Sequence, residues 1–295
     1  MCIISGILNG KAAVITGAGR GLGRAFALAF AGQGASVLVN DLGTEMNGEI
    51  TGNRPADETV AEITAKGGKA VANYESVAAV EGGEKIINAC VENFGKIDIL
   101  VNNAGILRDH MIWNMTPEEW DTVLKVHLYG VFNCTKPAVI MMKQQGSGRI
   151  INITSPTVVN GAPGQSNYGT AKAGILGFTR VLARELGRYG ITVNALLPVA
   201  ATRMTDFFDE EVKKTIPLAE DNAPVVAYLA SDAAANINGQ VIGSNGGLVS
   251  LYTPAPVIVK TICKDGRWTV EELAEIMPAT LEADMVGPEP PKPPK

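Results

Sequence analysis

Short, continuous apolar runs alternate with longer segments of helical spacing along most of the chain. The runs occupy residues 11–16, 35–40, 69–74, 98–101, 149–154, 191–197 and 240–243. Segments with helical periodicity or helix-start signals lie at about 24–33, 56–66, 81–94, 117–142, 171–188 and 222–229. Continuous apolar runs are typical of strands buried on both faces of a parallel sheet. The pattern therefore predicts an α/β fold, with one Rossmann-type, doubly wound parallel sheet and helices on both faces.

The alternation ends near Gly247. We expect residues 1–250 to form the Rossmann domain and residues 251–286 to form a C-terminal extension packed on it. Within the extension, Thr269-Val270-Glu271-Glu272 is a capping box that predicts a helix to about Met277. Residues 287–295 (GPEPPKPPK) form a proline-rich tail, which is typical of a linker or a disordered end.

Composition and charge narrow the classes of function. The 295 residues are 46% hydrophobic and 19% charged, as in a globular protein. A net charge of -5 without a cationic block argues against a nucleic-acid partner. No apolar run reaches the roughly 18 residues of a membrane span, and the N-terminus has no basic leader. Four widely spaced cysteines and two histidines predict neither a metal site nor a disulfide framework, so we expect a cytoplasmic protein.

A glycine-rich loop follows the first apolar run. Thr16, Gly17, Gly21 and Gly23 give the pattern T-G-x-x-x-G-x-G, with Arg20 and Leu22 inside the same loop. Glycines let the backbone turn sharply and bring amide N–H groups against a pyrophosphate at a helix N-terminus. The alternative is a merely flexible loop, but a strand before it and a helix after it favour phosphate binding.

Asp41 ends the second apolar run, where an adenosine ribose would present its hydroxyl groups. A carboxylate there accepts hydrogen bonds from the ribose and repels a 2′-phosphate, so we predict NAD rather than NADP, although Arg20 is a cation that could favour the extra phosphate. Ser76 and Val77 follow the third run and either line an adenine pocket or form an ordinary turn. Small and amide residues after the fourth run suit a close approach of the cofactor, namely Asn103, Ala104 and Gly105.

Tyr168 and Lys172 are four residues apart and would share one face of a helix. An ammonium beside a phenol lowers the pKa of the phenol, which could then exchange a proton with an alcohol. Ser155, just after a buried strand, could hydrogen-bond the same substrate oxygen. Tyr-x-x-x-Lys alone is weak evidence, because a helical tyrosine is usually a packing residue; the cofactor signals upstream give the pattern its weight.

With these motifs in place, the chain resembles classical members of the short-chain dehydrogenase/reductase family over about residues 10–250. Within that family it is most similar to the (3R)-hydroxyacyl-CoA dehydrogenase branch found in peroxisomal multifunctional enzymes. The stretches that carry the closer resemblance are 39–43, 67–74 and 102–109. The resemblance implies that Ser155, Tyr168 and Lys172 are catalytic. It also implies that Pro198 and Thr202 contact the cofactor, and that the protein is a homodimer or homotetramer.

Two positions depart from the family pattern. His127 stands where the family usually has a catalytic asparagine, as it does in the hydroxyacyl-CoA branch, and we include it among the catalytic candidates. Val199 stands where a glycine usually follows the proline. Nothing in the chain resembles a hydratase domain, and a free-standing bacterial-type enzyme is the simpler interpretation.

The resemblance implies an NAD-dependent oxidoreductase of fatty acid metabolism that interconverts a (3R)-3-hydroxyacyl-CoA and a 3-ketoacyl-CoA. A hydroxysteroid or other hydrophobic alcohol dehydrogenase is an alternative. A non-catalytic NAD-binding subunit of a hetero-oligomer is an alternative of another class, disfavoured by the intact Ser155, Tyr168 and Lys172. Apolar candidates for the substrate region are Trp113, Met204, Phe207 and Phe208, which could equally be packing residues.

Overall fold

Each apolar run forms a strand in the computed structural model, which describes residues 6–203, 211, 214–253 and 256–284. The strands pair in parallel in the order β3-β2-β1-β4-β5-β6-β7. Their bounds are β1 (Ala12–Thr16), β2 (Ser36–Asn40), β3 (Lys69–Asn73), β4 (Ile99–Asn102), β5 (Gly148–Ile153), β6 (Ile191–Val199) and β7 (Val241–Asn245). The predicted parallel, doubly wound sheet is therefore confirmed.

An eighth strand, β8 (Leu248–Tyr252), pairs antiparallel with β7 at the edge of the sheet. This strand was not predicted from the sequence, because its side chains are exposed rather than buried. Its last residue lies just beyond the boundary predicted at residue 250. The chain divides into two compact units, residues 1–254 and 255–295.

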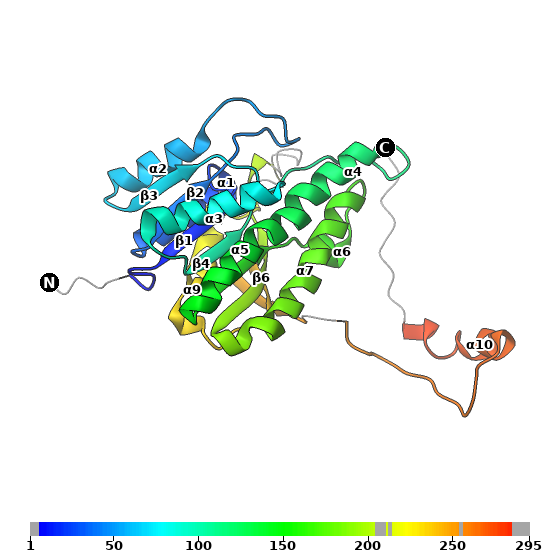
Figure 1. Ribbon diagram of the computed structural model, residues 1–295. Helices are drawn as coiled ribbons and strands as arrows, with labels where there is room; N and C mark the ends of the chain where they lie inside the picture. The colour runs from blue at the N-terminus through cyan, green and yellow to red at the C-terminus, as the bar shows by residue number, and fades with distance from the viewer. Residues whose placement is uncertain (1–5, 204–210, 212–213, 254–255, 285–295) are drawn as a thin grey trace. The chain divides into compact units, whose positions relative to one another are not determined.

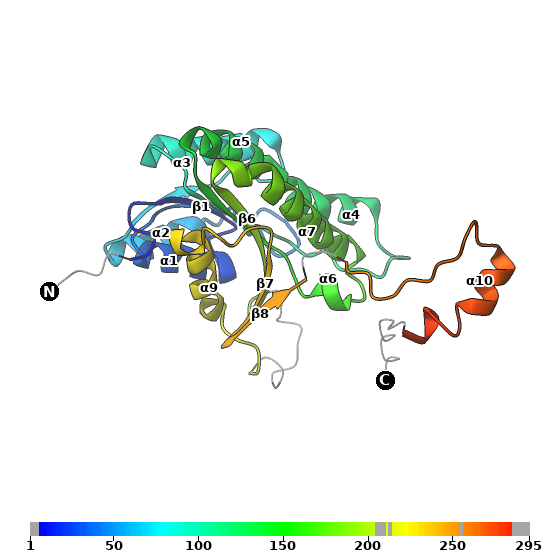
Figure 2. The same ribbon diagram turned by 90° about the horizontal axis from the view of Figure 1, so that it is seen from below.

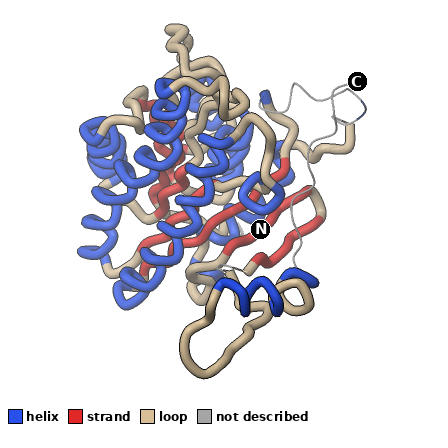
Figure 3. Tube along the Cα trace, turned by 90° about the vertical axis from the view of Figure 1, so that its right-hand side faces the viewer, coloured by secondary structure: helices blue, strands red, loops and turns tan. Residues whose placement is uncertain are grey.

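Helices cover both faces of the sheet (Figures 1 and 2). One face carries α1 (Gly21–Gly32), α2 (Pro55–Ala65) and α9 (Ala223–Ala230), and the other carries α3 (Val80–Phe94), α5 (Gly130–Gln145) and α7 (Ser166–Leu186). Figure 3 shows the strands in red between these blue helices. The first unit also contains the short helices α6 (Thr157–Asn160), η2 (Gly187–Tyr189), η4 (Ala219–Asn222) and η5 (Asp232–Ala234).

Along the parallel strands, alternate side chains pack into two apolar cores, one on each face of the sheet. On β1, Ile15 packs in the core beneath α1 and α9, whereas Val14 packs in the core beneath α3 and α5. Phe26 and Phe30 of α1 are the largest side chains in the first core, and both are fully buried. Burial on both sides explains why the runs are continuously apolar instead of alternating with polar residues.

The long helix predicted over residues 117–142 is built from three segments. Thr116 caps α4 (Pro117–Leu124) through the predicted box: its hydroxyl accepts the Glu119 N–H at 3.2 Å, and the Glu119 carboxylate accepts the Thr116 N–H at 2.8 Å. A π-helical turn, η1 (Lys125–Tyr129), then separates α4 from α5. Such turns hold one residue more than an α-helical turn and are frequent at functional sites.

The second unit contains α10 (Val270–Ile276) and the 3₁₀ turn η6 (Glu282–Asp284). The predicted capping box is present, since the Thr269 hydroxyl accepts the Glu272 N–H at 3.2 Å. The packing of this extension on the first unit stays a prediction, and the proline-rich tail lies outside the described residues. Across the described part of the chain, no helix is both long and apolar enough to cross a membrane.

Polar side chains cross the middle of the sheet below the strand ends. Asn102 of β4 donates from Nδ2 to Asn152 of β5 at 2.8 Å, and Asn152 donates to the hydroxyl of Thr179 on α7 at 2.9 Å. Asn152 and Thr179 are fully buried. Because buried polar groups are costly when unpaired, this chain fixes α7 against the two central strands.

We expect Asn152→Ala to lower the free energy of unfolding by about 2–4 kcal/mol, because it leaves two buried partners without their hydrogen bonds. Urea denaturation followed by circular dichroism measures this change. Asn93→Ala on the exposed face of α3 is the matched control and should stay within about 0.5 kcal/mol of the parent. Equal effects of the two substitutions would contradict a stabilising role for the buried chain.

Candidate active site

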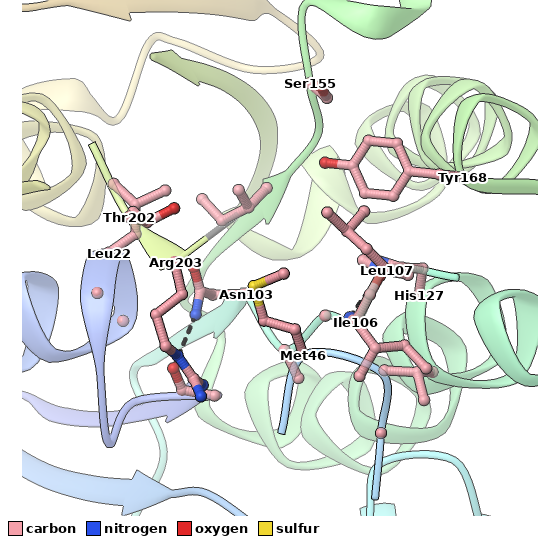
Figure 4. Close-up of a pocket in the computed structure, with 18 of the residues that line it drawn as sticks. Leu22, Met46, Asn103, Ile106, Leu107, His127, Ser155, Tyr168, Thr202 and Arg203 are labelled. Carbon is pink, nitrogen blue, oxygen red and sulfur yellow. Dashed lines mark hydrogen bonds between the residues drawn. The ribbon is translucent and has the colours of Figure 1, made fainter. Parts of the chain in front are cut away.

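A cavity of about 890 Å³ opens at the carboxyl ends of the parallel strands (Figure 4). Every residue that the sequence analysis named as catalytic or cofactor-binding lines it. These residues are Gly17, Arg20, Gly21, Leu22, Gly23, Asp41, Ser76, Val77, Asn103, Ala104, Gly105, His127, Ser155, Tyr168, Lys172, Pro198 and Thr202. The residues come from the ends of strands β1 to β6 and from the loops and helices that follow them, and parallel pairing brings those strand ends to one edge.

Of the four substrate candidates predicted from the sequence, only Trp113 lies among the described residues. Trp113 is 75% exposed and is not among the residues that line the cavity. Met204, Phe207 and Phe208 lie outside the described residues. Apolar side chains that do line the cavity include Met46, Ile106 and Leu107.

The glycine loop joins β1 directly to α1, which begins at Gly21 rather than at the predicted residue 24. Gly17 has a φ of +63°, in the left-handed region that favours glycine. A Cβ on Gly23 would lie 2.1 Å from the Gly17 carbonyl oxygen, so helix and loop can meet only without a side chain there. No side chain caps the N-terminus of α1, and its first amide N–H groups are suited to an anionic group in the cavity.

Thr16 and Asn103 tie the glycine loop to the end of β4. The Thr16 hydroxyl accepts hydrogen bonds from the N–H groups of Asn103 and Ala104, both at 3.0 Å. The Asn103 side-chain amide donates to the carbonyl oxygens of Thr16 at 2.9 Å and Gly17 at 3.0 Å. These bonds explain why an amide residue follows the fourth strand: it satisfies the carbonyls that the turn leaves unpaired.

Asp41 is held by both of its carboxylate oxygens. Oδ2 accepts the N–H of Gly19 at 2.9 Å, and Oδ1 accepts the N–H of Gly43 at 2.9 Å. The carboxylate thus lies fixed between the glycine loop and the loop after β2, at the wall of the cavity. Each oxygen keeps a further lone pair for a ligand hydroxyl group.

The loop after β2 crosses toward the opposite side of the cavity. The carbonyl of Met46 accepts the N–H of Leu107 at 2.8 Å, and Arg203 pairs with Glu45 at 3.3 Å. Neither Glu45 nor Met46 is among the site residues predicted from the sequence.

Tyr168 lies on the first turn of α7 and directs its hydroxyl into the cavity toward Ser155 (Figure 4). Lys172 lies one turn further, is only 4% exposed, and donates from Nζ to the carbonyl of Ile153 at 2.7 Å. Its Nζ is 5.5 Å from the centre of the Tyr168 ring. The helical spacing therefore does bring phenol and ammonium together, next to the end of β5.

Burial acts on both groups against their charged forms. It lowers the pKa of Lys172 to about 7. It also raises the pKa of Tyr168, while a hydrogen bond with Ser155 lowers that pKa and the negative charge of Asp109 raises it. The net direction is opposite to the expected lowering by Lys172, because the spacing of two residues carries no information about their desolvation and because a lysine with a pKa near 7 is charged only part of the time.

His127 lies in the π turn η1 and is 1% exposed. Its Nε2 is 2.8 Å from the carbonyl oxygen and 3.1 Å from the backbone nitrogen of Ile106. The ring meets Tyr168 edge to face, with ring centres 5.1 Å apart. Burial lowers the pKa of His127 to about 3, so the imidazole is neutral at ordinary pH. A Cβ on Gly105 would lie 2.4 Å from this ring, which explains the glycine at that position.

Three further polar residues of the cavity escaped the sequence analysis: Asp109, Thr157 and Gln165. Asp109 follows the Asn-Asn-Ala-Gly stretch, Thr157 begins α6, and Gln165 precedes α7. Gln165 is three residues before Tyr168, a spacing that would have placed it near the phenol. No comparable signal links Asp109 to the other two.

Comparisons with known proteins agree with this geometry. The sequence model of short chain dehydrogenases matches residues 11–214. A 3-oxoacyl-(acyl-carrier-protein) reductase of Synechocystis is 44% identical over 250 residues, covering 82% of this chain and 98% of that protein. The mouse peroxisomal multifunctional enzyme type 2 is 45% identical over 231 residues, covering 78% of this chain but only 31% of that protein.

A solved structure has the same fold over nearly the whole length. The crystal structure of a short chain dehydrogenase from Mycobacterium avium is 40% identical and matches with a TM-score of 0.84, covering 97% of this chain and 99% of that one. The matching family model, these relatives and the arrangement of the cavity lead to one conclusion. The chain belongs to the short-chain dehydrogenase family.

Proposed function

We propose that this protein is an NAD-dependent oxidoreductase that interconverts a (3R)-3-hydroxyacyl-CoA and a 3-ketoacyl-CoA. Membership of the family makes it an oxidoreductase of CH–OH groups with a nicotinamide cofactor. The observation that carries the proposal is the convergence of Ser155, Tyr168 and Lys172 in the cavity that the glycine loop also lines. The relatives named for a 3-oxoacyl substrate and for a peroxisomal multifunctional enzyme support an acyl group with oxygen at its third carbon.

The cavity suits a dinucleotide. The uncapped N–H groups of α1 would hold the pyrophosphate, and the fixed carboxylate of Asp41 would accept the ribose hydroxyl groups. A negative charge at that point disfavours the 2′-phosphate of NADP, which is our reason for proposing NAD. Ser76 and Val77 would lie against the adenine, and Pro198 and Thr202 against the nicotinamide end.

When bound, the nicotinamide accepts or delivers the hydride. The residues of this chain would handle the proton and the position of the substrate oxygen. Tyr168 exchanges the proton with that oxygen, and Ser155 hydrogen-bonds it. Lys172, held by Ile153, would bind the nicotinamide ribose, and the neutral His127 ring packs the phenol in place. Ile106 and Leu107 offer apolar surface for the acyl chain.

We also propose that the protein works as a homodimer or homotetramer. The edge strand β8 supports this, because Leu248, Val249 and Leu251 expose most of their apolar surface there. Contiguous exposed apolar side chains are typical of surfaces that another chain covers.

The direct test follows absorbance at 340 nm with NAD and a panel of secondary alcohols. We expect turnover of (3R)-3-hydroxyacyl-CoA and little with hydroxysteroids or simple alcohols. The panel includes the same acyl group on acyl carrier protein, since one relative is named for that carrier. Turnover of hydroxysteroids alone would refute the acyl-CoA proposal, and no turnover of any alcohol or ketone would favour a non-catalytic subunit.

Tyr168→Phe removes the hydroxyl that exchanges the proton while keeping the ring. We expect kcat to fall by about 10²–10⁴-fold, with the Kd for NAD nearly unchanged. Steady-state kinetics and a fluorescence titration with NADH measure the two quantities. Tyr228→Phe, at an exposed tyrosine of α9, is the control and should keep full activity. Retained turnover in Tyr168→Phe would remove the phenol from its proposed role.

Asp41→Ala removes the carboxylate proposed to bind the ribose. We expect the Kd for NAD to rise by about tenfold or more and the preference over NADP to shrink, because the charge that repels a 2′-phosphate is gone. Asp41→Asn separates the two effects, since it keeps an acceptor for one neighbouring N–H group but loses the charge. Titration calorimetry with both cofactors gives the ratio of Kd values, and an unchanged ratio would contradict this assignment of the ribose site.

A further inference from the structure

A continuous chain of side-chain hydrogen bonds runs along the cavity wall from Ser155 to Asp109. The Ser155 hydroxyl lies 3.1 Å from the Thr157 hydroxyl, which lies 3.3 Å from Oε1 of Gln165. Nε2 of Gln165 is 2.7 Å from Oδ2 of Asp109. All four side chains line the same cavity as Tyr168. The chain joins three separate elements: the segment after β4, α6 with the residues before it, and the start of α7.

The chemistry of the groups gives this chain a direction. A carboxylate can only accept, so Gln165 must turn its NH₂ group to Asp109 and its carbonyl oxygen to Thr157. The carbonyl oxygen of Gln165 can also only accept, so Thr157 donates its single hydroxyl proton to Gln165. Toward Ser155, Thr157 is left as an acceptor. The proton of Ser155 then points to Thr157, away from the phenol.

Ser155 has one proton and two possible acceptors, Thr157 and the oxygen of Tyr168. When Tyr168 is a neutral phenol, it can donate to Ser155, and every bond of the chain is kept. When Tyr168 is a phenolate, Ser155 can turn its proton to it, and this is the hydrogen bond that lowers the pKa of Tyr168; the bond from Ser155 to Thr157 is then lost. Ionising the phenol therefore breaks the hydrogen bond from Ser155 to Thr157, which is the last bond of the chain that begins at the Asp109 carboxylate.

We propose that Asp109, acting through Gln165 and Thr157, orients the hydroxyl of Ser155 so that Tyr168 is held as a neutral phenol. This inference rests on the proposed function for its meaning in catalysis: a neutral phenol can give its proton to a ketone oxygen, so the site is poised for carbonyl reduction at neutral pH. The three residues are positioning residues, because they act through Ser155. The negative charge of Asp109 also acts directly on the phenol in the same direction.

The other groups that face Tyr168 do not replace the chain. Lys172 lies on the same helix and favours the phenolate when charged, and His127 packs from η1 as a neutral ring. Burial raises the pKa of Asp109, while its hydrogen bond with Gln165 and, when His110 is protonated, the charge of that neighbour lower it. Two contributions to the pKa of Tyr168 must therefore be separated: the chain of hydrogen bonds through Thr157, and the direct effect of the charge of Asp109.

The test measures the ionisation of Tyr168 in the full-length protein without cofactor or substrate. Tyrosine labelled with ¹³C at Cζ reports the ratio of phenolate to phenol at about pH 10, and Tyr168→Phe identifies the signal. Thr157→Val cuts the chain and should raise this ratio by up to about tenfold, which corresponds to the loss of one hydrogen bond between neutral groups. Gln165→Met cuts the same chain elsewhere and should do likewise. Thr157→Ser keeps the hydroxyl and should match the parent.

A double-mutant cycle separates the chain from the direct charge. Asp109→Asn should raise the phenolate-to-phenol ratio more than Thr157→Val does. Adding Thr157→Val to Asp109→Asn should then raise the ratio by far less than a further tenfold, because both substitutions break the same chain of hydrogen bonds. Asp121→Asn, an exposed carboxylate on α4, controls for loss of charge and should have no effect.

Two results would overturn the proposal: an unchanged ratio in both Thr157→Val and Gln165→Met, or fully multiplicative effects in the double variant. Because this titration needs no turnover, it stands apart from the substrate panel. A failed panel with the expected titration would refute the proposed function alone. Turnover in the panel together with an unchanged phenolate-to-phenol ratio in the variants would refute only the proposed role of the hydrogen-bond chain.

Discussion

Because β1, β4, β5 and β6 pair in parallel, each of them ends at the same edge of the sheet, and four segments far apart in the sequence meet there. The apolar side chains of both faces fix the register, since a slip by one residue would exchange the two cores. The polar atoms at the strand ends then pair with one another, as Thr16 and Asn103 do. The cavity lies between these loops.

Desolvation governs the chemistry of that cavity. Lys172 and His127 are buried and Tyr168 is half-buried, and each has its pKa moved toward the neutral form. A site built in this way responds strongly to every charge that enters it, because little solvent is present to screen the interaction. In the proposed function, the carboxylates of Asp41 and Asp109 would therefore act on opposite ends of the bound dinucleotide and substrate.

Much of this could be predicted from local sequence. Continuous apolar runs gave the strands, and the glycine loop, Asp41 and the Tyr168–Lys172 spacing gave residues that all line one cavity. What local sequence could not supply was the environment of each side chain. The pKa direction of Tyr168 depends on burial, and the role proposed for Asp109 depends on a contact with Gln165 from a distant segment. Strand β8 was missed because its exposed residues follow no buried pattern.

The π turn at η1 has a consequence for how one helix serves two neighbours. An α-helix advances about 100° per residue, so the single additional residue of a π turn rotates everything after it by roughly that angle. The stretch before the turn, α4, contacts α7, while the stretch after it, α5, contacts α3. The continuous helical segment from α4 to α5 can in this way pack against both α7, which carries Tyr168, and α3. The side chain at the point of rotation, His127, is turned inward against the phenol.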